Sequence, residues 1–136
     1  MEKIQLLKNN INKIYKWINP TPCERRLSKL DKAHKLGEKY FYKKKYERAE
    51  KMFREEINLD PEWPLGYQWL GRALLYLEEF DGAISCYETA IKKMQELRQR
   101  DPFDPEYKRG LKVLCEEFKT LKDVIRQVQE EDANSK

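Results

Sequence analysis

Three closely spaced pairs of prolines constrain the fold of this 136-residue chain more than any other feature of its sequence. The pairs are Pro20 and Pro22, Pro61 and Pro64, and Pro102 and Pro105. Because proline is excluded from the interior of a helix, each pair marks a break. Between the breaks, apolar residues recur at steps of three and four, and no long stretch alternates with a period of two. The sequence therefore predicts an all-α fold.

Local signals set the expected helix boundaries. Thr21 is suited to an N-cap, Pro22 to a first helical turn, and Glu24 to a capping box. Residues 43–45 form a predicted turn, and a second interruption is predicted at Phe80 to Gly82, where aspartate is followed by glycine. We thus expect helices over about 4–18, 21–42, 46–58, 65–78, 82–100 and 105–130. The last carries a coiled-coil-like seam: Tyr107, Leu111, Leu114, Phe118, Leu121, Ile125 and Val128.

The sequence also contains an internal repeat with a period of 34 residues. Seven pairs of residues at this spacing keep their chemical class: Leu36/Leu70, Gly37/Gly71, Tyr40/Leu74, Tyr46/Phe80, Ala49/Ala83, Phe53/Tyr87 and Ile57/Ile91. Glycine and alanine allow two helices to approach closely, while leucine and aromatic residues fill the space around the crossing. A single helical hairpin cannot cover its own apolar face, so stacked hairpins are expected.

These positions resemble the tetratricopeptide repeat family, in two units at about 31–61 and 64–95. The resemblance implies antiparallel helical hairpins stacked as an α-solenoid. It assigns nine residues to packing within the repeats: Leu36, Gly37, Tyr40, Ala49, Phe53, Leu70, Gly71, Ala83 and Tyr87. The chain departs from the motif at Glu56, where a small residue is preferred, and no proline closes the second unit.

The resulting organisation has three parts. Residues 1–20 are expected to form a basic amphipathic helix, residues 21–104 the two repeats, and residues 105–136 a long capping helix with a short polar tail. Because stacked repeats need more than two units to bury a continuous core, both terminal helices are expected to supply cover. The capping helix should pack on the helix before it through Tyr87, Ile91, Met94 and Leu97.

The resemblance further implies a non-catalytic protein-binding adaptor, or a small scaffold subunit of a larger assembly, that binds a protein or peptide in an inner groove. The groove candidates are His34, Glu38, Phe41, Tyr42, Gln68, Arg72, Leu75 and Tyr76. As an alternative, Phe41 and Leu75 only pack on the terminal helices. Some members of the family grip the acidic tails of chaperones; here Glu38 would repel a carboxylate, and Trp69 replaces an asparagine, so such tails are disfavoured.

Charge is distributed unevenly. Residues 1–46 hold 13 Lys and Arg against 4 Asp and Glu, a net charge of +9, while residues 47–136 hold 15 against 20, a net charge of −5. A basic N-terminal third suits an anionic partner such as RNA or an acidic protein surface. The helix at 4–18 could lie on a membrane surface, act as a nucleic-acid arm, or simply pack on the repeats. An RNA-associated or ribonucleoprotein component is therefore the alternative function.

Enzymatic chemistry is not indicated. His34 is the only histidine, and no nucleophile, paired carboxylates or phosphate loop can be assigned beside it, so we expect no catalytic residue, metal or cofactor. Cys23, Cys86 and Cys115 are interpreted as small core residues. The first twenty residues lack the apolar block of a secretory signal, and the longest apolar run, 73–77, is too short to cross a bilayer. We expect an intracellular, cytoplasmic protein without a transmembrane segment.

Overall fold

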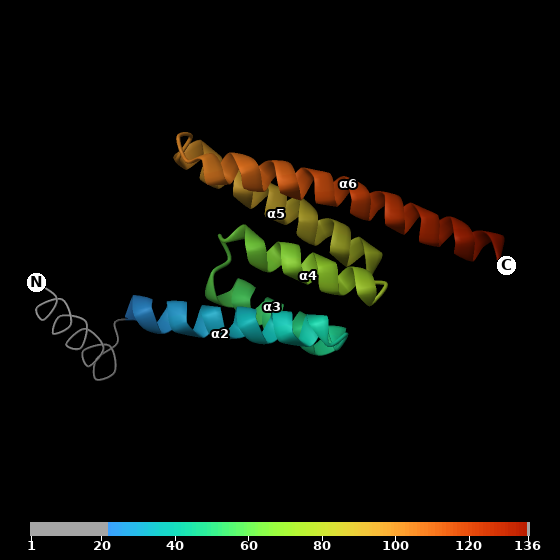
Figure 1. Cartoon of the computed structure of the whole chain (residues 1–136), viewed down its shortest axis with the longest axis horizontal. Coiled ribbons are helices and arrows are strands. Elements are labelled where there is room, and N and C mark those ends of the chain that lie inside the picture. Colours follow the sequence, from blue (N-terminus) through green and yellow to red (C-terminus); the bar gives the residue numbers. More distant parts are fainter. Residues whose placement is uncertain (1–21, 136) are drawn as a thin grey trace, which may run out of the picture.

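The computed structural model describes residues 22–135, and within that range its regular secondary structure consists of five helices. They are α2 (Pro22–Tyr42), α3 (Tyr46–Leu59), α4 (Pro64–Tyr76), α5 (Phe80–Arg100) and α6 (Pro105–Asn134), shown in Figure 1. The prediction of an all-α fold is confirmed for this part of the chain. The helix predicted at 4–18, with the membrane and nucleic-acid interpretations attached to it, lies outside the described residues.

Proline pairs mark two of the breaks as expected. Pro64 and Pro105 are each the first residue of a helix, where the missing N–H of proline costs no hydrogen bond. The side chain of Asp104 caps α6 by accepting a hydrogen bond from the backbone N–H of Glu106 at 2.9 Å. In these two pairs the second proline starts a helix, and the first, Pro61 or Pro102, lies in the loop before it.

The expected interruption at Phe80 to Gly82 is wrong. All three residues lie in the first turn of α5, and the break falls earlier, at residues 77–79. There Glu78 adopts a left-handed conformation with φ of 61°, as Lys44 does in the preceding turn with φ of 62°. Gly82 instead packs closely on α4: an added Cβ would lie 3.2 Å from a Leu74 methyl group, so Leu74 would have to shift by a few tenths of an ångström.

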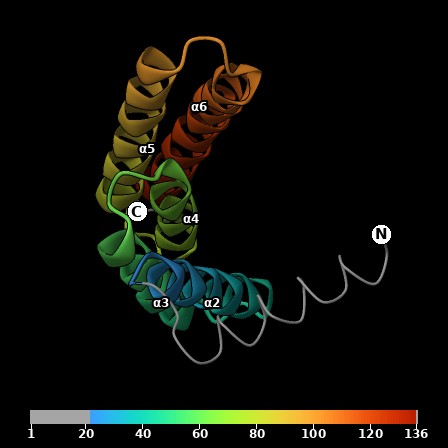
Figure 2. The same ribbon diagram turned by 90° about the vertical axis from the view of Figure 1, so that its left-hand side faces the viewer.

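Consecutive helices pack on one another in the order of the chain, from α2 on α3 to α5 on α6. Figure 2 shows the result as two layers, with α2, α4 and α6 on one side and α3 and α5 on the other. Any surface formed by α2, α4 and α6 is thus assembled from parts of the chain that are far apart in sequence. In the described part of the chain, no helix has both the length and the apolar character required to cross a membrane.

The core lies between the layers. Ala49, Ala83 and Phe53 are completely buried, and Tyr87 is almost completely buried. Close approach explains the glycine at position 71, since a Cβ there would lie 2.7 Å from the ring of Tyr87. Of the nine residues assigned to packing, seven are buried, and the other two, Leu36 and Tyr40, are half-buried.

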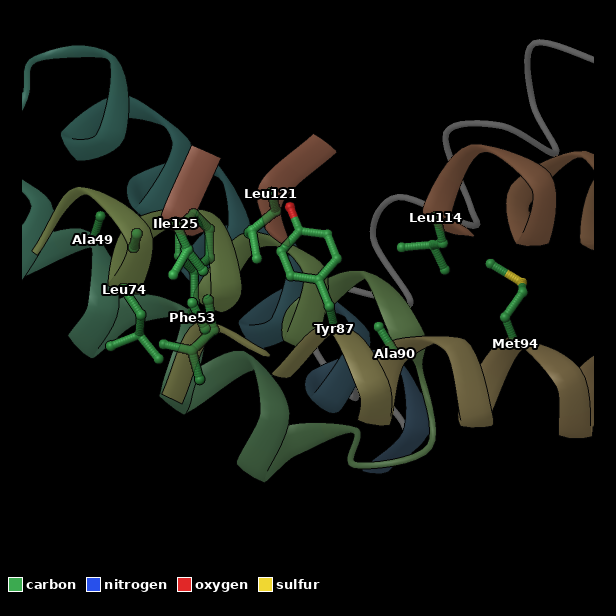
Figure 3. Packing of buried hydrophobic residues seen from close by; sticks show 12 residues of the cluster. Ala49, Phe53, Leu74, Tyr87, Ala90, Met94, Leu114, Leu121 and Ile125 are labelled. Carbon is green, nitrogen blue, oxygen red and sulfur yellow. The ribbon is translucent and has the colours of Figure 1, made fainter. Parts of the chain in front are cut away.

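Helix α6 continues the core along α5. Leu114 faces Met94 (Figure 3), and the rings of Tyr87 and Phe118 stack in parallel with centroids 5.9 Å apart. Leu121 and Ile125 are buried further along the same seam. With 30 residues against 21 in α5, α6 is the longer helix, and its C-terminal end projects past the start of α5 (Figure 1).

Candidate interaction groove

A groove of about 310 Å³ opens on the layer formed by α2, α4 and α6. Four helices contribute to it: α2 at its C-terminal end, α4 along its C-terminal part, α5 through Tyr87, and the middle of α6. Its lining is mainly apolar and aromatic: Phe41, Tyr42, Trp69, Arg72, Leu75, Tyr76, Tyr87, Glu117, Thr120, Leu121 and Val124.

Aromatic rings form one wall of this groove. Phe41 contacts Tyr42, Trp69 and Tyr76 edge to face, with centroids 5.6 Å from its own in each case. Tyr76 also stacks on Tyr46 at 4.6 Å. Tyr42 is 72% exposed and Tyr76 57% exposed, so Phe41 supports two rings that present most of their surface to solvent. Such rings offer a large contact area with little conformational freedom left to lose.

The charged groups in the groove are bonded to each other. Glu117 of α6 accepts hydrogen bonds from Arg72 Nε at 2.5 Å and Arg72 Nη2 at 2.8 Å, and from Gln68 Nε2 at 2.8 Å. The hydroxyl of Tyr87 donates to the same carboxylate. Arg72 also lies over the ring of Trp69, 4.6 Å from its centroid. One carboxylate thus joins α4, α5 and α6.

These contacts change the acidity of the groups involved. Burial would raise the pKa of Glu117, but the hydrogen bonds from Arg72 and Tyr87 outweigh burial and hold that pKa below its usual value. The hydrogen bond to Glu117 raises the pKa of Arg72, and burial followed by the same carboxylate raises the pKa of Tyr87. At neutral pH the network therefore consists of a carboxylate, a guanidinium and a neutral phenol.

A second ionic cluster lies between α2 and α3. His34 Nε2 contacts Glu38 at 2.8 Å, and His34 Nδ1 contacts Glu56 at 3.0 Å. Only the imidazolium can donate to carboxylates through both nitrogens. Burial would lower the pKa of His34, but the hydrogen bond and charge of Glu56, with those of Glu38, raise it instead. Burial also raises the pKa of Glu56, and this effect exceeds the lowering by His34.

Of the eight predicted groove residues, five line the groove and three lie elsewhere. The five are Phe41, Tyr42, Arg72, Leu75 and Tyr76. Gln68 is buried beneath it and bonded to Glu117, while His34 and Glu38 belong to the cluster with Glu56. Phe41 and Leu75 also pack against the core, and their packing on the terminal helices stays a prediction.

In comparisons with known proteins, no protein-family model matches the chain, and no curated protein matches it either. The groove therefore has to be interpreted from its own chemistry.

Sequence reasoning missed the residue that joins the three helices. Glu117 was one of several acids in the last helix, and only its position beside the seam, between Leu114 and Leu121, could have marked it as half-buried. Glu56 gave a clearer signal, because it occupies a position where the repeat motif prefers a small residue. Trp69, noted only for the asparagine it replaces, contributes a central ring of the aromatic wall.

The remaining reactive side chains lie outside the groove. Cys86 is half-buried against the core, and burial raises its pKa to about 11, so its thiol stays protonated at neutral pH. The core interpretation is wrong for Cys115, which is exposed on α6. No group of three or more His, Cys, Asp or Glu residues in the range 22–135 could hold a metal ion. In the His34 cluster the two carboxylates face different ring nitrogens and do not converge on one point.

The His34 cluster predicts a stability that falls with rising pH. Because the pKa of His34 is raised above 6.5 in the folded state, its contribution is complete below pH 6.5 and is lost as pH rises through the folded pKa. The raised pKa of Glu56 likewise makes the folded state less stable as the pH rises above 4.5. We expect the melting temperature of the parent protein to exceed that of His34→Gln by more at pH 6 than at pH 8.5. If the difference in melting temperature between the two proteins is the same at both pH values, the pKa of His34 does not change on folding.

Proposed function

We propose that this protein is a non-catalytic interaction module, an adaptor or scaffold subunit, that binds an apolar or aromatic segment of a partner protein in the groove between α2, α4 and α6. The observation that supports it best is the pair of exposed rings, Tyr42 and Tyr76, that Phe41 contacts at the side of the groove. Exposed aromatic residues beside a groove are typical anchors of protein interfaces.

The chemistry of the groove favours an uncharged ligand side chain. Arg72 and Glu117 satisfy each other, so an incoming charge would lose its water without gaining a free partner. An aliphatic or aromatic side chain loses nothing of this kind and covers Leu75 and Val124.

A tetratricopeptide-like α-solenoid remains our proposal for the architecture, and the turns support it. Lys45 N donates to Tyr40 O at 2.9 Å, and 34 residues later Glu79 N donates to Leu74 O at the same distance. The left-handed residues, Lys44 and Glu78, are also 34 apart. A non-catalytic role is supported by His34, both of whose nitrogens are engaged by carboxylates of the same fold.

The test compares partners captured from cells by the parent protein and by the double variant Tyr42→Ala/Tyr76→Ala, identified by mass spectrometry. We expect specific partners to fall by about tenfold or more, which corresponds to about 1.4 kcal/mol of binding free energy. Phe103→Ala is the matched control, because that ring is 92% exposed in the loop before α6. Circular dichroism should show an unchanged helical content for both variants. Full retention of partners by the double variant, or equal loss with Phe103→Ala, would contradict the proposal.

A further inference from the structure

A line of cations runs along the face of α6 that adjoins its seam, in a sector that contributes no residue to the groove on α2 and α4. The cations recur at steps of four, seven, three and four residues: Lys108, Lys112, Lys119, Lys122 and Arg126. Cys115 occupies the remaining position of the same 4-3 spacing. At 1.5 Å per residue these positions form a stripe about 27 Å long on one face of the helix. We call this the α6 cationic stripe.

Charges on α6 are segregated. All five cations of the stripe are exposed, and none of the acidic residues of α6 falls on the stripe between its first and last cation. Among the described residues, Lys108, Lys112 and Lys119 form no ion pair. Lys122 lies over the ring of Phe118 at 4.4 Å, and Arg126 has a 3.4 Å contact with Asp123 that is exposed on both sides. The stripe therefore carries positive charge that the fold itself leaves largely uncompensated.

An apolar cleft adjoins the N-terminal end of the stripe. It has a volume of about 440 Å³ and lies where the end of α5 meets the start of α6. Pro105, Leu111 and Cys115 supply its apolar surface, and Arg98 of α5 adds a cation to those of Lys108 and Lys112. Its only other charged residue, Arg109, is paired with Glu106. A ligand here meets an apolar surface with positive charge around it.

We propose that the stripe and its cleft bind an acidic amphipathic helix of a partner protein. Acidic side chains on such a helix repeat with the same steps of three and four, so several carboxylates can face the stripe at once. An apolar side chain from the same helix would enter the cleft beside Leu111. This surface is separate from the groove and does not depend on the function proposed for it.

Two other anionic partners fit the surroundings less well. A flat anionic membrane would also meet Glu116 and Asp123, which border the stripe on the side away from the seam, whereas a helix contacts only a narrow strip. Single-stranded RNA is commonly bound by aromatic rings on which bases stack. Among the described residues, the ring of Phe118 beside the stripe is half-buried, stacked on Tyr87 and covered by Lys122.

The experiment measures binding of a labelled synthetic helix to the full chain by fluorescence anisotropy at physiological ionic strength. The peptide has about 20 residues, long enough to span the stripe, with glutamates at 4-3 spacing and leucines beside them. A second peptide has the same composition with its glutamates spread around the helix. Oligouridylate and vesicles of phosphatidylcholine and phosphatidylserine serve as the other two probes.

The decisive variant is Lys112→Glu/Lys119→Glu/Arg126→Glu. Its matched control, Lys29→Glu/Lys32→Glu/Lys51→Glu, makes the same change in net charge at exposed positions on α2 and α3. We expect the stripe variant to bind the patterned peptide at least about tenfold more weakly than the parent, and the control within about twofold, because only the former replaces attraction by repulsion at the contact. The scrambled peptide should bind more weakly than the patterned one.

Four results would each overturn the proposal: no binding of the patterned peptide, equal binding of the scrambled peptide, equal loss in the control variant, or tighter binding of oligouridylate or vesicles than of the peptide. Circular dichroism melts establish that the variants fold. If the triple glutamate variant does not, Lys112→Gln/Lys119→Gln/Arg126→Gln makes the same comparison without introducing negative charge.

Discussion

A chain that ends at Arg100 is expected to aggregate or to melt as a partly unfolded protein. The truncation removes α6, and with it Leu114, Leu121 and Ile125, each of which is at most 4% exposed. Burial of a large aliphatic side chain contributes roughly 1.5–3 kcal/mol. Three such residues approach the whole stability of a domain of this size, about 5–15 kcal/mol. The truncation also uncovers Tyr87 and Met94 on α5, which favours aggregation.

The matched control for this experiment ends at Gln129. It removes residues 130–136, whose described side chains are all exposed, and leaves the seam complete. Melting curves followed by circular dichroism, together with size-exclusion chromatography, compare the two truncations with the full chain. We expect the longer one to melt like the parent. A monomeric product with an unchanged midpoint from the chain that ends at Arg100 would show that α6 is a separate arm and not part of the core.

Substitution of Glu117 by alanine is expected to destabilise the fold by roughly 2–3 kcal/mol, because it leaves several polar groups without their acceptor. Tyr87, only 1% exposed, loses the partner of its hydroxyl, and the guanidinium of Arg72 loses its counter-charge. The side chains of Arg72 and Glu117 are 29% and 26% exposed, so water screens part of the loss.

Glu116→Ala is the control for this substitution, since the neighbouring acid is exposed. Chemical denaturation gives the free energy of unfolding of both variants. We expect Glu116→Ala to stay within about 0.5 kcal/mol of the parent. If the two variants unfold alike, the bonds to Glu117 contribute no net stability. A double-mutant cycle with Arg72→Ala then separates the ion pair from the hydrogen bond of Tyr87.

Features fixed by local chemistry could be predicted from the sequence. Proline restricts the backbone wherever it occurs, which is why the starts of α4 and α6 at Pro64 and Pro105 were predicted to within a residue. The turn before α5 was misplaced because Gly82 has two explanations, backbone freedom and close packing. Gly82 lies in the first turn of α5 and packs against Leu74, and both are properties of the folded chain.

Contacts between distant helices could not be predicted in the same way. Periodicity identifies the face of α6 that is buried, but not which donors on α4 and α5 meet a carboxylate at its edge. Glu117 and Gln68 are 49 residues apart, and nothing in either local pattern links them. Likewise, His34 was a groove candidate by its place in the repeat, while its partner Glu56 is 22 residues further along the chain.

The carboxylate shared by three helices links two equilibria. Glu117 holds α6 in place and at the same time forms a wall of the groove, so a ligand that needs the complete groove binds only molecules in which α6 is docked. Thermodynamic linkage then works in both directions: the ligand raises the free energy needed to detach α6, and a change that loosens α6 lowers the apparent affinity for the ligand. A substitution in the seam, such as at Leu114, can therefore weaken binding without touching the bound segment, by reducing the fraction of molecules that are competent to bind.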